Sequence, residues 1–87
     1  MKIKDGFMLR QVGGQAIVVA VGEASRDFNG IIKLNSVGQF LWEALTEDTT
    51  EEALVEKLLA SYEVEKDIAT ADVAAFVAKL KGADLLV

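Results

Sequence analysis

Residues 30–45 read GIIKLNSVGQFLWEAL, and within this stretch the spacing of the apolar side chains changes. Ile32 and Leu34 alternate with Lys33, which is the two-residue period of a β-strand with one buried face. After Leu34 the apolar residues recur at i, i+3, i+4, i+7 and i+8, the spacing of one helix face: Val37, Phe40, Leu41, Ala44 and Leu45. The stretch therefore predicts a strand that passes directly into a helix, with Asn35 or Ser36 as the N-cap.

Two further strands are expected upstream of this stretch. Phe7–Val12 and Gln15–Val21 flank Gly13-Gly14, a two-residue loop that can take the positive φ angles of a tight hairpin. Both faces of Gln15–Val21 are apolar, which suits a central strand. A polar loop over residues 22–27 then leads to the third strand, Gly30–Leu34.

Two more helices are expected downstream. Thr49–Glu52 fits a capping box, with Thr49 as the cap, and the helix that follows carries an apolar stripe made of Leu54, Val55, Leu58, Leu59 and Tyr62. The last helix is predicted over Lys66–Lys81, with Gly82 as the residue that ends it, and with Val73, Phe76, Val77 and Leu80 facing inward. We expect residues 84–87 to form a short extended segment on the core.

This order of elements predicts an α+β fold, a three-stranded antiparallel sheet followed by three α-helices. At 87 residues the chain has room for a single domain over residues 1–87. A domain of this size hides only roughly 60–65% of its unfolded surface, so it needs an apolar core. The composition meets that need, since 52% of the residues are hydrophobic and the mean hydropathy is +0.30.

The residue types that are missing exclude several kinds of chemistry. The chain contains no Cys and no His, so disulfides, thiolate-bound metals and Ser-His-Asp or Cys-His catalysis are excluded. We expect no enzymatic activity and no cofactor. The longest apolar run, residues 16–21, is far below the roughly 20 residues that span a bilayer, and no signal peptide is recognisable. The sequence therefore predicts a cytoplasmic protein with no membrane partner.

Charge is distributed unevenly along the chain. Residues 1–34 carry five basic and three acidic side chains, a net charge of +2, whereas residues 35–87 carry four basic and eleven acidic side chains, a net charge of −7. Binding to nucleic acid requires clustered Lys and Arg that neutralise phosphates. The acidic half therefore argues against a nucleic-acid partner.

Three features suggest places where function could reside. Gly30–Leu34 is expected at a sheet edge and has only Lys33 to block it, so it could dock an extended peptide or be a merely structural edge. Trp42 lies beside the main stripe of its helix, as expected for a residue at the rim of the core or for an interface anchor. Phe76 and Tyr62 are expected in the core.

Two other protein classes share some of these features. Three helices beside a small sheet also describe a winged helix, and a DNA-binding transcriptional regulator is the alternative function, although the exposed positions of the last helix are mostly small or neutral. Asn35-Ser36-Val37 is similar to the Asp-Ser-Leu that carries the prosthetic group of acyl carrier proteins. The strand-forming first third and the Asn at the first position disfavour that second comparison.

Residues 30–45 resemble the PqqD family, whose pattern here is a hydrophobic strand, Leu-Asn, x-x-Gly, a hydrophobic-Trp pair and Leu. In this chain the pattern is met by Leu34-Asn35, Gly38, Leu41-Trp42 and Leu45. The resemblance continues through residues 49–52, 62–64 and 72–80, and covers about residues 3–87. The family usually has glycine directly before its terminal Leu-Leu, where this chain has Asp84 and places glycine at position 82.

The resemblance implies a winged-helix-like recognition domain that binds the leader of a ribosomally made precursor peptide and presents it to a modifying enzyme, often a radical SAM protein. The leader would be held as an added strand against the third strand, in a groove walled by the third helix. The residues implied are Gly30, Ile31, Ile32, Lys33 and Leu34 in the strand, and Asp72, Val73 and Phe76 in the helix. An exposed third strand would also permit a homodimer by exchange between protomers.

Overall fold

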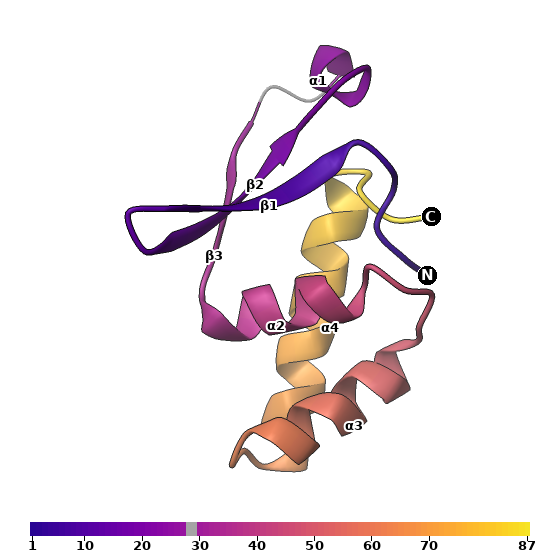
Figure 1. Ribbon diagram of the computed structural model, residues 1–87. Helices are drawn as coiled ribbons and strands as arrows, with labels where there is room; N and C mark the ends of the chain where they lie inside the picture. Colours follow the sequence, from indigo (N-terminus) through magenta and orange to yellow (C-terminus); the bar gives the residue numbers. More distant parts are fainter. Residues whose placement is uncertain (28–29) are drawn as a thin grey trace.

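The computed structural model describes residues 1–27 and 30–87 and shows a small sheet packed against helices (Figure 1). The elements, in chain order, are β1 (Phe7–Val12), β2 (Gln15–Ala20), α1 (Ala24–Asp27), β3 (Ile32–Leu34), α2 (Ser36–Ala44), α3 (Glu51–Ser61) and α4 (Lys66–Gly82). The predicted α+β architecture, strands first and helices after, is confirmed. Two predictions were wrong in detail, because a single helical turn, α1, occupies part of the expected polar loop, and β3 begins at Ile32 instead of Gly30.

The sheet is antiparallel with strand order β1-β2-β3, so β2 is central and β3 lies at an edge, as predicted. Gly13 and Gly14 form the two-residue turn between β1 and β2, with φ angles of 58° and 81°. This pair of positive φ angles belongs to the turn whose twist matches that of the flanking strands. Ala16 and Val18 are buried on the helix side of β2.

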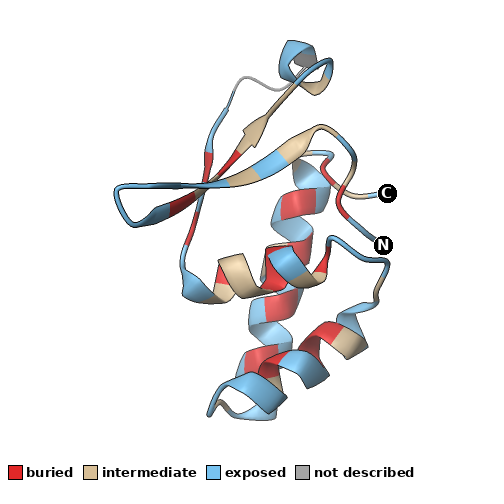
Figure 2. Cartoon of the chain, in the orientation of Figure 1, coloured by how far each residue is buried: buried red, intermediate tan, exposed pale blue. Residues whose placement is uncertain are grey.

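The core lies between the sheet and the helices, where the buried residues of Figure 2 concentrate. Leu41, Leu54, Leu58 and Leu80 are each at most 1% exposed, and they join the buried residues of β2 and β3 in one cluster. Trp42 is 3% exposed, so it belongs to the core. The predicted position at the rim was wrong, and an interface role for this side chain is excluded.

Side-chain caps begin two of the helices. Asn35 Oδ1 accepts a 2.7 Å hydrogen bond from the Gly38 amide at the start of α2, which selects Asn35 over Ser36 as the N-cap. Thr50 Oγ1 accepts a 3.1 Å bond from the Ala53 amide at the start of α3. The prediction that Thr49 caps this helix was wrong by one residue.

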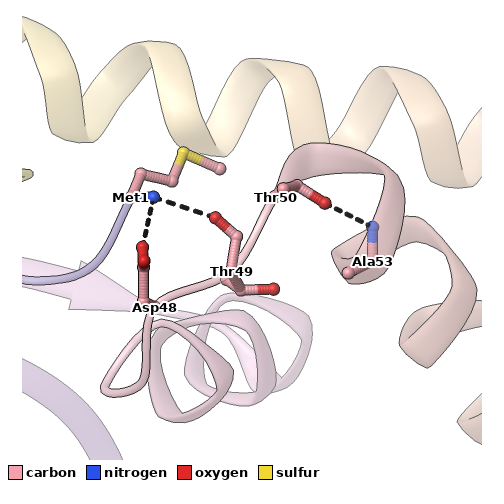
Figure 3. Close-up of polar contacts among 5 residues, drawn as sticks. All are labelled: Met1, Asp48, Thr49, Thr50 and Ala53. Atoms are coloured by element: carbon pink, nitrogen blue, oxygen red, sulfur yellow. Dashed lines mark hydrogen bonds and ion pairs between the residues drawn. The ribbon is translucent and has the colours of Figure 1, made fainter.

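The N-terminal segment explains this shift, because the main chain of Thr49 pairs with Met1 (Figure 3). The Thr49 amide donates to the Met1 carbonyl, and the Met1 amino group donates to the Thr49 carbonyl, both at 2.9 Å. The same amino group forms a 2.6 Å ion pair with Asp48. Thr49 is therefore held in a pairing between two segments, and its neighbour Thr50 caps the helix.

The two ends of the chain lie side by side (Figure 1). Lys2 and Val87 exchange two main-chain hydrogen bonds, and the Lys4 amide donates to the Leu85 carbonyl at 2.8 Å. On its other side the N-terminal segment is bonded to residues 45–49, through the Ile3 amide and the Leu45 carbonyl among others. We call this arrangement of residues 1–4, 45–49 and 85–87 the paired termini. The predicted extended C-terminal segment is confirmed for residues 85–87, whereas Asp84 belongs to the end of α4.

α4 extends one residue further than predicted, and the left-handed residue that ends it lies two residues further along the chain. Gly82 is the last helical residue, and the left-handed conformation falls on Asp84, with φ of 60°. The Leu85 amide bonds to the Leu80 carbonyl and the Asp84 amide to the Lys81 carbonyl, which is the hydrogen-bond pattern of a Schellman cap. Asp84 thus holds the backbone position at which the family pattern has glycine.

Candidate functional site

The open edge of β3 is the first component of the site. A two-residue turn makes Val12 and Gln15 a hydrogen-bonded pair, and alternation along β2 then directs the main-chain groups of Ala16 and Val18 toward β3. Leu34 and Ile32 face these two residues in the register. Lys33, opposite Ile17, therefore directs its amide and carbonyl away from β2, toward the open edge.

The side chains of β3 alternate as the sequence predicts. Ile32 and Leu34 are buried, whereas Lys33 is exposed on the face away from the helices. Gln15 anchors the end of the strand, because its side-chain amide donates to the carbonyl of Leu34 at 2.9 Å. Gly30 and Ile31 are exposed and precede the strand. Of the predicted strand residues, Lys33 is therefore the one within β3 that offers main-chain groups to a partner.

A hollow of about 280 Å³ lies between α2 and α4, next to the residue that follows β3. We call it the α2–α4 hollow. It is lined by Asn35, Val37, Gly38 and Leu41 on one side and by Asp72, Ala75, Phe76 and Lys79 on the other. Its floor is apolar, and Asp72 and Lys79 place one charge of each sign on the α4 wall. Such a surface can take an apolar side chain from an extended peptide.

The structure brings together two of the three helix residues that were predicted for the groove. Asp72 and Phe76 line the α2–α4 hollow. Val73 is 1% exposed and belongs to the core, so the prediction that it lines the same wall was wrong. At 100° per residue Val73 lies about 60° from Phe76 and about 100° from Asp72, beyond the edge of the face that borders the hollow. It borders a different hollow, between α3 and α4.

Sequence reasoning did not identify Ala75 and Lys79, which lie on the same wall. Their spacing from Asp72 and Phe76 on a helix was a usable signal, since residues three and four apart share a face. The sequence alone does not reveal how α2 crosses α4. This crossing determines which face of α4 borders the hollow.

The Leu34-Asn35-x-x-Gly38 motif shapes the junction between β3 and the hollow. A Cβ atom added at Gly38 would lie 3.2 Å from Asn35 Oδ1 and 3.4 Å from the Leu34 Cβ. The first approach is tighter than ordinary van der Waals contact and the second is at its lower limit, so glycine leaves room for the Asn35 cap and for the end of β3 beside the first turn of α2. The Asn35 cap that bonds to the Gly38 amide then fixes the direction of the helix.

A second, larger hollow of about 560 Å³ lies between α3 and α4. Its rim carries Glu51, Glu52 and Glu56, and its floor includes Val55 and Leu59. None of its lining residues belongs to the sheet, so a ligand bound there would not pair with β3. The α2–α4 hollow is therefore the stronger candidate for a site that continues from the strand edge.

Phe40 and Tyr62 form an aromatic pair, in which Phe40 packs against the core and Tyr62 is exposed. Phe40 and Tyr62 pack edge to face, with ring centroids 5.5 Å apart and an interplanar angle of 85°. Tyr62 is 37% exposed, so its predicted place in the core was wrong. It ends α3 instead of continuing the stripe, because α3 stops at Ser61.

Among residues 1–27 and 30–87, no group of three or more acidic side chains is close enough to hold a metal ion. None of the helices described there is both long and apolar enough to cross a membrane.

Comparison with known proteins identifies the family of this chain. The family model for coenzyme PQQ synthesis protein D (PqqD) matches residues 8–86. The chain belongs to the PqqD family. At the junction of β3 and α2, the structure shows Asn35 as a helix cap, Gly38 as a close packing site and Trp42 as a core residue. No curated protein matches the sequence significantly.

Two solved structures share the fold of this PqqD family member. One is TbiB1 in complex with the TbiA(beta) leader peptide, with a TM-score of 0.76, 23% identity, and coverage of 99% of this chain and 94% of that chain. The other is lasso peptide synthetase B1 complexed with the leader peptide, with a TM-score of 0.73, 19% identity, and coverage of 97% of this chain and 93% of that chain. Both neighbours are leader-peptide-binding proteins.

Proposed function

We propose that this chain binds the leader segment of a ribosomally synthesised precursor peptide, as an added strand on the open edge of β3. The observation that carries the proposal is the position of that edge beside an apolar hollow. Lys33 directs its main-chain amide and carbonyl outward, and the α2–α4 hollow begins at Asn35, two residues further along. Main-chain hydrogen bonds would supply affinity, and the hollow would select a side chain.

Alternation along the added strand gives the peptide two roles. Every second leader side chain would point to the helix side of the sheet, where the half-buried Val37 and Phe76 offer apolar surface. The residues between them would point to the opposite side, next to Lys33. Family membership and the two structural neighbours that hold leader peptides support this assignment.

The absence of His and Cys in the sequence removes the side chains on which much enzymatic catalysis depends. We propose that the chain performs no chemistry itself and presents the bound precursor to a separate modifying enzyme, with a radical SAM protein as the specific candidate. Precursor peptides are made by ribosomes, so we place the chain in the cytoplasm. Family membership supports a partner role of this kind.

An amide NMR titration of the chain with the leader peptide encoded beside it tests the binding proposal. The expected result is saturable shifts at residues 30–35 and on α4 at 72–79, at micromolar peptide or below. A scrambled peptide of the same composition is the control. If the encoded leader leaves these amides unmoved, while duplex DNA shifts α4, the chain is instead a DNA-binding protein.

A further inference from the structure

The face of the sheet that points away from the helices is largely apolar and is not packed against the core. Its side chains are those of Met8, Arg10, Val12, Gln15, Ile17, Val19 and Lys33, which the register places on one side of the three strands. Met8 is 45% exposed and Val12 is 59% exposed. We call this surface the outer sheet face.

The outer sheet face differs in charge from the rest of the molecule. Arg10, Ile17 and Lys33 lie directly opposite one another across the three strands, so two cations flank an apolar side chain. The strands contain no Asp or Glu, whereas the whole chain has a net charge of −5. In residues 1–27 and 30–87, the ion pairs Met1–Asp48 and Lys4–Asp84 leave Arg10 and Lys33 available to an external partner.

We infer that the outer sheet face is the docking surface for the modifying enzyme, and that the enzyme meets it with apolar side chains and carboxylates. An apolar patch that contains fixed cations is complementary to a partner of that composition. A second copy of this chain is a poor occupant, because the same face of another protomer would bring Arg10 and Lys33 toward like charges without a carboxylate to pair them.

This inference rests on the proposed function, and it adds a prediction about coupling. A leader added to β3 would extend the sheet by one strand, and every second leader side chain would then lie on the outer sheet face. The enzyme would contact the chain and the leader together. Leader and enzyme should therefore each raise the affinity for the other by the same factor.

The experiment uses the full chain, its encoded leader peptide and the purified modifying enzyme encoded beside it. Met8→Ser and Arg10→Glu change β1 side chains on the outer sheet face, two strands away from the β3 edge. We expect each to weaken enzyme binding, about tenfold for Arg10→Glu, and to leave the dissociation constant of the leader within about twofold. The matched controls are Ile68→Ser and Lys57→Glu, which alter exposed residues on α4 and α3.

A second measurement does not depend on any variant. Enzyme added to the isotope-labelled chain should broaden the amide signals of β1 and β2 more than those of α3, and the effect should strengthen when leader is present. The inference is overturned if enzyme binding responds to the controls and not to Met8→Ser and Arg10→Glu. It is also overturned if Met8→Ser abolishes self-association of the chain, or if Arg10→Glu abolishes binding to anionic vesicles. Leader binding is measured on the chain without enzyme. If the leader does not bind there, the proposed function is overturned instead of this inference.

Discussion

The paired termini and the β3 edge both contain short extended segments, but the hydrogen bonding of their backbone groups differs. The segment over residues 1–4 is hydrogen-bonded on both sides, to residues 85–87 and to residues 45–49. Within the part of the chain that the structure describes, β3 is bonded on one side only, to β2. The same small fold therefore closes one extended segment with its own chain ends and leaves another open. An open edge is a liability unless it is used, so its retention fits a binding role.

Changes at the paired termini should therefore alter stability without altering leader binding, and changes beside β3 should alter leader binding without altering stability.

The largest effect is expected for Leu85→Ala. Leu85 is fully buried and follows Asp84 in the cap of α4. Its truncation should lower the free energy of unfolding by about 2–5 kcal/mol, since it removes a core side chain and leaves a cavity. Chemical denaturation measures this loss, and an unchanged midpoint would show that the paired termini do not stabilise the fold.

The next effect separates the two sides of α4. Ala74 and Ala75 are adjacent and exposed, but Ala74 lines the α3–α4 hollow and Ala75 the α2–α4 hollow. Ala75→Arg should weaken leader binding about tenfold, because the long side chain fills the hollow beside β3. Ala74→Arg is the matched control and should change the affinity by less than about twofold. Isothermal titration measures the leader affinity of both variants. A larger loss of affinity for Ala74→Arg than for Ala75→Arg would place the peptide site in the α3–α4 hollow.

A smaller effect is expected at the end of α4. Asp84 adopts φ of 60°, a conformation that glycine tolerates better than any L-residue. Asp84→Gly should raise the free energy of unfolding by about 0.5 kcal/mol, since relief of backbone strain exceeds the loss of the exposed 2.8 Å ion pair with Lys4.

Two control variants separate the backbone strain from the ion pair. Asp84→Ala keeps a Cβ at a positive φ and loses the short polar side chain that lets Asp tolerate the left-handed region, so it should lower the free energy of unfolding by about 1 kcal/mol. Lys4→Ala removes the ion pair alone and should have almost no effect. Destabilisation of equal size by Asp84→Gly and Asp84→Ala would contradict the strain argument.

The smallest effect concerns pH. The Met1 amino group, which is hydrogen-bonded and ion-paired to Asp48, holds the pKa of that carboxyl below its usual value. The pair therefore stabilises the fold near neutral pH, and this contribution disappears as the pH falls through the lowered pKa. Asp48 is largely exposed, so the effect is small. Asp48→Asn should be slightly less stable than the wild type at pH 7 and equal to it near pH 2, in thermal unfolding followed at both pH values.

Acetylation of the amino terminus is the matched control for the pH effect. It removes the cation and leaves Asp48 in place, so it should abolish most of the difference between the wild type and Asp48→Asn. A difference that persists after acetylation, or one that grows at low pH, would assign the stabilisation to another group.

Local patterns in the sequence predicted the elements that local physics determines. The two glycines of the hairpin, the alternation of Ile32 and Leu34 around Lys33, and the helical spacing after Asn35 each act within a few residues, and each is confirmed. α1 was missed because four residues are too short to show a helical period.

Features that depend on distant segments could not be read from local patterns. Thr49 and Thr50 are equivalent as caps until the pairing of Thr49 with Met1 is known. The end of α4 depends in the same way on the segment that follows it, where Leu85 is buried against the core. In the candidate site, the spacing along α4 indicated Asp72 and Phe76, but only the packing of α2 shows that Val73 is on the wrong face.

The central claim is that the open edge of β3 binds the leader through main-chain hydrogen bonds, and a proline comparison between the two edges of the sheet tests it most directly. Lys33→Pro removes an outward amide from β3, and Gln11→Pro removes one from the opposite edge, on β1. Both variants keep the hydrogen bonds to β2, and Lys33→Ala measures the contribution of the side chain alone.

We predict that Lys33→Pro weakens leader binding tenfold or more (about 1.4 kcal/mol) in isothermal titration. Lys33→Ala should weaken leader binding clearly less than Lys33→Pro does, and Gln11→Pro should bind the leader as tightly as the wild type. Equal affinities for folded Lys33→Pro and Gln11→Pro would contradict strand addition at β3.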